Sequence, residues 1–156
     1  MSNRHRAVWI DLGAVIDGTA IIEPGAKIEA GVTIARNVRI CAGAVIEHDT
    51  TVSAGAQIDS NVRIGHSSHI GVGVRIESGA EIGPGATLAA RVRIERDAKI
   101  GSGVDVAEDA IVGGGSLVKS GVRVGARARV RSGARIASGQ NIPSDAHAST
   151  SIREIL

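Results

Sequence analysis

Aliphatic residues recur at every sixth position along nearly the whole chain, with no break in the spacing. The series begins with Ile10, Ile16 and Ile22 and continues to Ile142. A short fixed period of this kind is typical of a solenoid, in which each repeat buries its apolar side only against neighbouring repeats. The pattern therefore predicts one elongated domain of stacked repeats.

Within each repeat, two further positions have a restricted composition. A small or branched residue such as Ala14 or Val32 stands two places before the aliphatic one, and alternate residues of a strand share a face, so both are expected to point inward. Three places before it the residue is most often Gly, or else Asn or Asp. These types tolerate a left-handed backbone. Each repeat is therefore predicted to be a short strand followed by a sharp corner.

Composition agrees with this interpretation and narrows the function classes. The 156 residues include one Trp, no Phe and no Tyr, so Ile, Val, Leu and Ala must form the interior. The net charge of +2 does not favour a nucleic-acid partner, and a single cysteine, Cys41, excludes an intrachain disulfide framework. No apolar run is long enough to span a membrane or act as a secretion signal. We expect a cytoplasmic protein without membrane or nucleic-acid partners.

The repeat resembles that of the hexapeptide-repeat family over roughly Ala7 to Ile142. The resemblance implies an all-β, left-handed parallel β-helix of triangular section, with three hexads in each coil. Strands stacked about 4.8 Å apart would give seven to eight coils without loop insertions, in a rod of roughly 35 Å. We predict a single β-helix domain over residues 1–148 and a tail or capping turn over 149–156. Pro143 to Leu156 is expected to leave the register, because Ala148 replaces the bulky aliphatic residue.

Folding the sequence at 18 residues per coil assigns the outward residues to three faces. One face combines a column of arginines with a neighbouring column of acids, and we expect ion pairs between coils; the residues are Arg39, Arg75, Arg93 and Arg129 with Glu23, Asp59, Glu77 and Glu95. Another face is flat and nearly uncharged, with Thr33, Thr51 and Thr87 in one column. It suits contact with a copy of itself, and the resemblance implies a homotrimer. Ice binding by the threonines is an alternative, but a second threonine column is missing.

His48 and Asp49 form the most suggestive pair for chemistry. Both fall at a corner beside the flat face, and a histidine next to a carboxylate can act as a general base. The stretch resembles the corner of hexapeptide acyltransferases that modify nucleotide sugars, sialic acid and lipid A. That resemblance implies that His48 is the base, Asp49 orients it, acetyl-CoA is the donor and the acceptor is sugar-like. Cys41 and Gln57 stand where the sugar acetyltransferases commonly have Asn and His.

The stretch from Ile111 to Lys119 resembles the late-coil segment with which acetyltransferases contact coenzyme A. The resemblance assigns cofactor binding to Gly113, Gly115, Ser116, Lys119 and Arg123. Between Asp109 and Asp145 the chain has no acidic residue and several arginines, so this end can attract phosphate groups.

Two other functions remain open from the sequence. An uninterrupted register with few aromatic residues also fits a non-catalytic scaffold or self-assembling structural protein. A weaker alternative is a metal protein like the γ-class carbonic anhydrases, with His66 and His69 as candidate ligands, although Gly71 stands where that family has another histidine.

Overall fold

The computed structural model describes residues 8–149 and contains 24 strands of two residues each, spaced six residues apart. They form three parallel sheets of eight strands. Sheet A contains β1 (Trp9–Ile10), β4 (Lys27–Ile28), β7 (Val45–Ile46), β10 (Arg63–Ile64), β13 (Glu81–Ile82), β16 (Lys99–Ile100), β19 (Leu117–Val118) and β22 (Arg135–Ile136). Sheet B contains β2 (Val15–Ile16), β5 (Thr33–Ile34), β8 (Thr51–Val52), β11 (His69–Ile70), β14 (Thr87–Leu88), β17 (Asp105–Val106), β20 (Arg123–Val124) and β23 (Asn141–Ile142). Sheet C contains β3 (Ile21–Ile22), β6 (Arg39–Ile40), β9 (Gln57–Ile58), β12 (Arg75–Ile76), β15 (Arg93–Ile94), β18 (Ile111–Val112), β21 (Arg129–Val130) and β24 (His147–Ala148).

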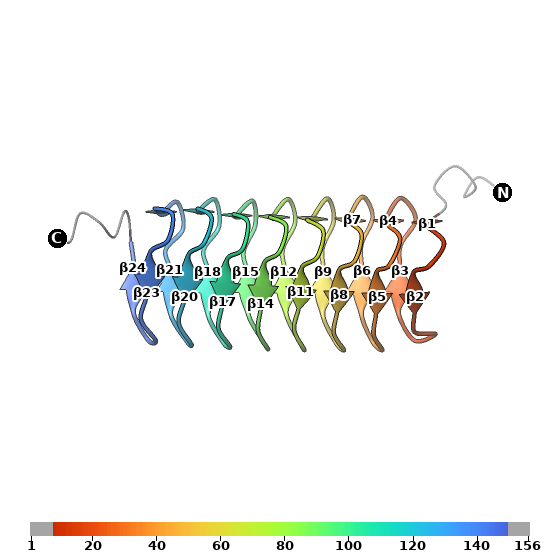
Figure 1. The fold of residues 1–156 in the computed structure, drawn as a ribbon, viewed down its shortest axis with the longest axis horizontal. Helices are drawn as coiled ribbons and strands as arrows, with labels where there is room; N and C mark the ends of the chain where they lie inside the picture. Colours follow the sequence, from red (N-terminus) through yellow and green to blue (C-terminus); the bar gives the residue numbers. More distant parts are fainter. Residues whose placement is uncertain (1–7, 150–156) are drawn as a thin grey trace.

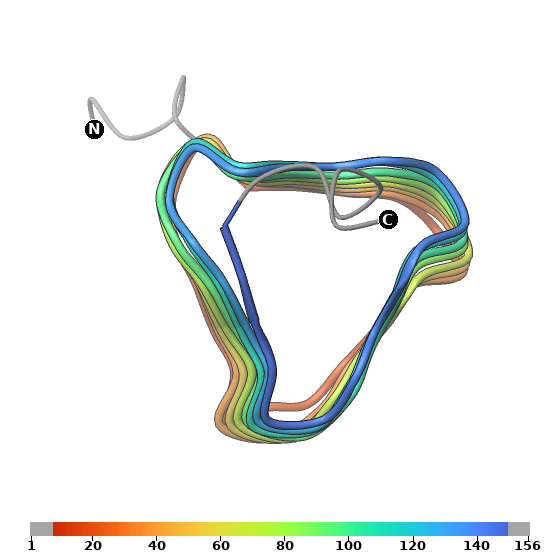
Figure 2. The ribbon, with the colours of Figure 1, turned by 90° about the vertical axis from the view of Figure 1, so that its left-hand side faces the viewer.

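Three consecutive strands, one from each sheet, make one coil, and eight coils stack into a straight rod (Figure 1). Seen along the rod, the coils superimpose as a triangle (Figure 2). Each strand pairs in parallel with the strand 18 residues later, so Ile28 lies directly opposite Ile46. The predicted left-handed parallel β-helix without insertions is confirmed. Coils are numbered 1 to 8 from the N-terminal end below.

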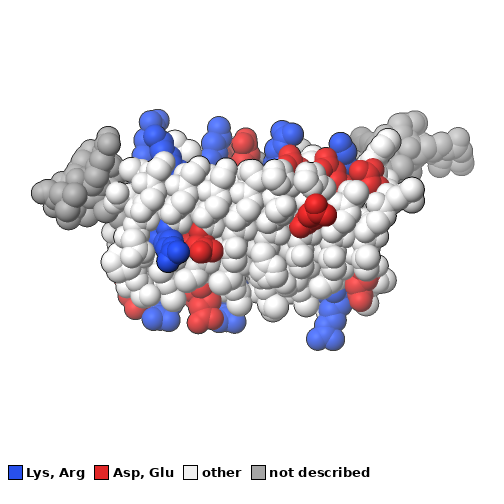
Figure 3. Space-filling model, viewed as in Figure 1, with Lys and Arg blue, Asp and Glu red and all other residues white. Residues whose placement is uncertain are grey.

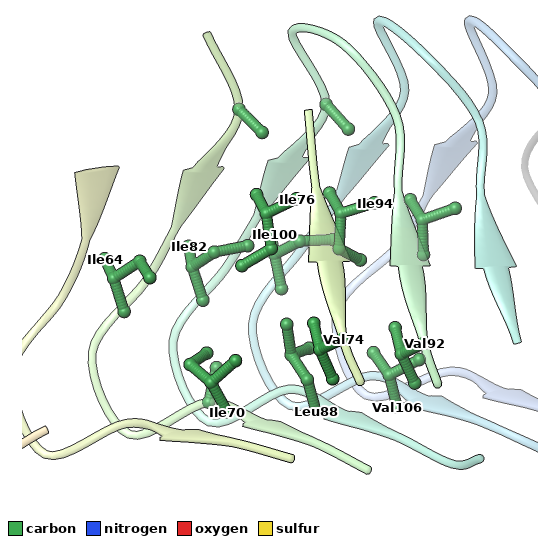
Figure 4. Close-up of a cluster of buried hydrophobic side chains, with 14 of the residues drawn as sticks. Ile64, Ile70, Val74, Ile76, Ile82, Leu88, Val92, Ile94, Ile100 and Val106 are labelled. Atoms are coloured by element: carbon green, nitrogen blue, oxygen red, sulfur yellow. The ribbon is translucent and has the colours of Figure 1, made fainter. Parts of the chain in front are cut away.

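The interior of the triangle is a continuous aliphatic core. Ile64, Ile82 and Ile100 from sheet A meet Ile76 and Ile94 from sheet C, and sheet B closes the cluster (Figure 4). These side chains are at most 3% exposed. Because each coil is too thin to bury its own aliphatic residues, the coils above and below it complete the burial.

The corners adopt the left-handed backbone that the repeat requires. Every predicted Asn and Asp corner residue has a positive φ near 60°, as do Ser67, Arg91 and Arg127, which the sequence pattern did not single out. Arg91 and Arg127 each form a bidentate ion pair with the aspartate 18 residues later, Asp109 and Asp145 respectively. These hydrogen bonds lower the pKa of both aspartates.

The C-terminal end departs from expectation. Residues Pro143 to Ser149 do not leave the register, because β24 pairs with β21 and Ala148 is 5% exposed. Backbone hydrogen bonds from Arg129 and Arg131 to coil 8 hold this strand, and they do not depend on side-chain size. The prediction that the register ends at Pro143 is therefore wrong. The predicted tail or capping turn over 149–156 lies, beyond Ser149, outside the described residues.

The charged face on sheet C forms part of the predicted ion-pair network. Arg39 approaches Glu23 at 3.6 Å and Arg93 approaches Glu77 at 3.0 Å, in each case across adjacent coils. Arg75 instead donates to Gln57. Among residues 8–149 there is no helix of the length and apolarity that crossing a membrane requires.

Candidate functional site

The corner between sheets A and B brings two histidines together in coils 3 and 4. His48 follows β7 and His66 follows β10, so the 18-residue repeat places one above the other. Their rings are parallel within 2°, with centroids 4.8 Å apart. Their separation of 18 residues is one coil, and the strand pairing of Val45 with Arg63 brings the two rings into register.

Asp49 is positioned to orient the first of these imidazoles. Its Oδ2 lies 3.1 Å from His48 Nδ1, so the carboxylate accepts a hydrogen bond when Nδ1 carries the proton. The left-handed backbone of Asp49, with φ 60°, directs the carboxylate along the corner, and its N–H donates to Ala30. The other ring nitrogen of His48 is thereby left as an acceptor. Both side chains are about half exposed or more, at 51% and 67%.

His66 has a weaker partner at the equivalent place. Ser67 Oγ lies 3.4 Å from His66 Nδ1, and the Ser67 hydroxyl is uncharged. The two stacked histidines therefore differ electrostatically, since only His48 has an adjacent carboxylate hydrogen-bonded to its ring.

Acidic side chains hold the backbone of this corner. The His48 N–H donates to Glu29 at 3.0 Å, and the His66 N–H donates to Glu47 at 3.1 Å. Each acid stands one coil earlier. These bonds to ionised acceptors are stronger than neutral ones and fix the direction in which the imidazoles leave the corner.

Beneath the histidines, two buried hydroxyls replace the usual aliphatic residues. Thr50 donates to the Gly65 carbonyl and Ser68 to the Gly83 carbonyl, each at 3.1 Å. Both residues are at most 2% exposed. Sequence reasoning missed this pair, although the signal was present as Thr and Ser at inward positions that in most other repeats carry Ala or Val. The hydroxyls tie coils 3, 4 and 5 together below the site.

A shallow groove of about 560 Å³ runs along the outer face of sheet A from this corner. Its floor includes the successive glycines Gly65, Gly83 and Gly101, where a Cβ would collide with the backbone of the next coil. Lys99 lines the groove, and Lys119 lies near its far end. The column of glycines is the sequence signal for this groove, and it was overlooked.

The groove begins beside the stacked histidines, because Glu47 and Gly65 line it and immediately precede His48 and His66. Coil 3 and coil 7, which contains Lys119, are four strand spacings apart, or about 19 Å. The groove is therefore long and open to solvent, and its charged lining is mixed: Glu47 pairs with Arg63 near the histidines, and Glu81, Lys99 and Lys119 follow along the rod.

The predicted cofactor residues do not form one cluster, because they lie at three different places around the coil. Gly113, Gly115 and Ser116 form the corner between sheets C and A, where the Ser116 hydroxyl is buried and donates to the Gly113 carbonyl at 2.7 Å. Lys119 lies in the groove on sheet A, whereas Arg123 lies on sheet B. Within one chain, only Lys119 shares a surface with the histidine corner.

His69 lies on the outer face of sheet B, in β11, three residues beyond His66. Within residues 8–149, no group of three or more His, Cys, Asp or Glu side chains is arranged to hold a metal ion.

Sheet B presents the flat face that the sequence predicted. Its outward residues are mainly Thr, Ala, Ser and Gly, and the face turned to the reader in Figure 3 carries few charges. Charged side chains gather along its upper and lower borders (Figure 3). A second hollow of about 370 Å³ lies on this sheet between Thr87, Asp105 and Arg123.

No family model matches the sequence, and no curated protein matches it either. Similar solved structures do exist. The chain superimposes on UDP-N-acetylglucosamine O-acyltransferase (LpxA) from Moraxella catarrhalis with a TM-score of 0.60 and 15% identity, over 88% of this chain and 62% of that one. LpxA from Acinetobacter baumannii gives 0.63 and 17%, over 88% and 68%. A hexapeptide transferase family protein from Anaplasma phagocytophilum gives 0.52 and 22%, over 90% and 76%.

This chain has the hexapeptide-repeat β-helix fold. At these identities the likeness concerns the fold alone, and the chain spans 62% of the length of the Moraxella enzyme. A hexapeptide-repeat coil explains why residues 18 apart share a corner, as His48 and His66 do. Chemistry on this fold has to be argued from the site itself.

Proposed function

We propose that this protein is an acyltransferase that moves an acetyl group from acetyl-CoA to a hydroxyl or amino group of a sugar-like acceptor. The observation that carries the proposal is the contact of His48 Nδ1 with Asp49 at 3.1 Å, at the mouth of the groove on sheet A. The solved structures with the same fold that are described as acyltransferases support the reaction class.

The reaction requires one base and balances without a metal or a redox partner. Asp49 accepts a hydrogen bond from the Nδ1–H of His48, so the unprotonated Nε2 removes the proton from the acceptor hydroxyl or amine. The acceptor oxygen or nitrogen attacks the thioester carbonyl carbon, and a tetrahedral intermediate forms. The C–S bond then breaks, and the leaving sulfur takes the proton from His48 as the free thiol.

The groove on sheet A is the proposed binding site for the donor. Its length of about four coil spacings suits an elongated ligand, and Lys99 and Lys119 supply cations for the phosphates. The thioester end would then lie toward His48. Gly113, Gly115 and Ser116 lie one strand before Lys119 and are proposed to shape the cofactor end.

A homotrimer through sheet B completes the proposal. The small side chains at Thr33, Thr51 and Thr87 permit close approach of a second copy, whose edge would cover the half-exposed His48. In such a trimer Arg123 would reach the donor bound to an adjacent subunit. We expect the enzyme in the cytoplasm, where acyl-CoA is available.

The test combines calorimetry with a thiol-release assay. The intact protein should bind coenzyme A and release thiol from acetyl-CoA when supplied with a panel of amino and hydroxy sugars. His48→Ala should lower turnover by about 10²-fold or more while binding of coenzyme A persists. His147→Ala, an exposed histidine in coil 8, is the matched control and should leave turnover unchanged. Equal turnover in wild type and His48→Ala would remove His48 from the mechanism.

A non-catalytic scaffold is the second candidate. It is favoured by the 24 strands that follow one another without an inserted loop. Absence of coenzyme A binding at millimolar concentration would favour this function over acyl transfer.

A further inference from the structure

The two ends of the rod carry opposite charge. In coil 1 the residues that follow the three strands are Asp11, Asp17 and Glu23, and residues 8–26 contain no Lys or Arg. Toward the C-terminal end, Arg123 on sheet B and Arg129 and Arg131 on sheet C lie in coil 7, and Arg135 on sheet A lies in coil 8, which also contains Asp145.

Coil 1 also exposes apolar side chains at positions that are polar in the next coil. Trp9, Val15 and Ile21 occupy the outward strand positions and are 63%, 64% and 57% exposed. The same three columns carry Lys27, Thr33 and Arg39 in coil 2. Leu12, at the adjoining corner, is 95% exposed. The N-terminal end therefore combines an apolar surface with an acidic border.

The backbone gives the rod a direction. Each strand N–H donates toward the C-terminal end, as Val15 does to Val32 at 2.8 Å and Ile21 to Val38 at 2.9 Å. Among residues 8–149, no N–H donates to the strand carbonyls of coil 1, which are those of Val8, Ile10, Ala14, Ile16, Ala20 and Ile22. Within the same range no carbonyl accepts from the strand N–H groups of coil 8, which are those of Arg135, Ala137, Asn141 and His147.

We propose that this protein assembles head to tail, with coil 1 of one copy stacked on coil 8 of another. Strands β1, β2 and β3 would continue the sheets that end in β22, β23 and β24, so carbonyls meet N–H groups, and the acids of coil 1 approach the arginines of coils 7 and 8. Trp9 would lie over Arg135, an arrangement that favours a cation–π contact. The inference does not depend on the proposed acyl transfer.

The opposite arrangement, with two N-terminal ends in contact, is disfavoured by the same features. It would place carbonyls against carbonyls and Asp11, Asp17 and Glu23 against their own copies. A head-to-tail contact joins two different surfaces and does not close on itself, so it generates open filaments. The structure thus specifies both the partner, a second copy of this chain, and the polarity of the contact.

Sedimentation velocity on the full chain at low salt tests the interface. Wild type should form species that lengthen with concentration and that electron microscopy shows as rods longer than one molecule. Ile21→Lys places a cation over His147 and one coil away from Arg129, and it should raise the dissociation constant about tenfold or more. Ile111→Lys is the matched control, because it makes the same change in the same column at coil 6, where Glu95 is available as partner. Loss of association in both variants, or in neither, would overturn the proposal.

A disulfide test examines the register directly. In a Cys41→Ser background, the pair Ile21→Cys and His147→Cys would place the two α-carbons about 4.8 Å apart across the junction, inside the range of about 4.4–6.8 Å for disulfides. Oxidation should give a ladder of covalent multimers, and the pair Ile111→Cys and His147→Cys should not. Monomers throughout would show that coil 1 does not meet coil 8, and the proposal would be withdrawn.

Discussion

The carboxylate of Asp49 lies over the α-carbon of Gly31, one coil earlier at the same corner. A Cβ added at Gly31 would overlap Asp49 Oδ1 and lie 3.3 Å from its Cγ. Gly43 stands in the same relation to Asn61, and Gly79 to Asp97. At these three corners a side chain larger than glycine would collide with the Asn or Asp one coil later, and Gly31 is part of the geometry that presents Asp49 to His48.

Gly31→Ala should weaken both stability and catalysis. Residue 31 has a φ of +75°, which is strained for alanine, and the new methyl group would displace the Asp49 carboxylate. We expect the free energy of unfolding to fall by on the order of 1–3 kcal/mol. Chemical denaturation and thiol release measure the two effects. Gly43→Ala has the same strain at a different corner, so it should lose similar stability and keep its turnover. Equal losses of turnover in both variants would mean that the effect on activity is global.

Asp49→Asn should reduce turnover more than it reduces donor binding. The neutral amide does not stabilise the positive charge that His48 gains when it removes the proton of the acceptor. We therefore expect kcat to fall about tenfold or more while the KM for acetyl-CoA changes little. Steady-state kinetics with varied acetyl-CoA provides the measurement. Ser67→Ala, at the equivalent position beside His66, is the control and should leave kcat close to wild type.

The buried hydroxyl of Thr50 should contribute to stability although its position usually carries an aliphatic residue. Thr50→Val leaves the Gly65 carbonyl without this donor, and we expect a loss of about 1 kcal/mol in the free energy of unfolding. Thr51→Val changes the neighbouring outward side chain and should stay within about 0.5 kcal/mol of wild type. A neutral Thr50→Val would indicate that the carbonyl finds another partner.

Core truncations should depend on position along the rod. Ile64→Ala in coil 4 creates a cavity bounded by coils on both sides, with an expected cost of about 3 kcal/mol. Ile10→Ala in coil 1, where the side chain is 47% exposed, should cost about 1 kcal/mol or less. Denaturant titration of both variants tests this, and equal costs would contradict the dependence on stacking.

The arginine–aspartate pairs at the corner between sheets B and C should make stability sensitive to acid. Arg127 lowers the pKa of Asp145 through two hydrogen bonds, so the aspartate stabilises the folded state above its ordinary pKa near 4. That contribution is lost as the pH falls below about 4. Between pH 5 and 3, around the ordinary aspartate pKa of about 4, the melting temperature of Asp145→Asn should fall less than that of wild type. Asp105→Asn, an exposed aspartate on sheet B, is the control.

Much of this molecule followed from the repeat alone. The aliphatic period located the core, and the Gly, Asn and Asp residues three places earlier located the corners. The stack of His48 on His66 followed from their separation of 18 residues. These features are periodic, and in a solenoid a position in the repeat defines a place in space because each residue contacts its counterpart in the next coil.

Features that depend on the actual path of the backbone required the tertiary structure. The repeat did not reveal that Gly65, Gly83 and Gly101 line a groove, nor that Thr50 turns its hydroxyl onto a carbonyl. The repeat also ended the register too early, at Pro143, because Ala148 is small, whereas parallel-strand hydrogen bonds tolerate a small side chain. A repeating sequence thus determined which residues stack, because spacing alone sets the strand register. How closely consecutive coils approach each other depends on the three-dimensional path of the backbone and cannot be read from the six-residue spacing. That approach decided which stacked residues border a groove or an end surface open to a ligand or a second copy.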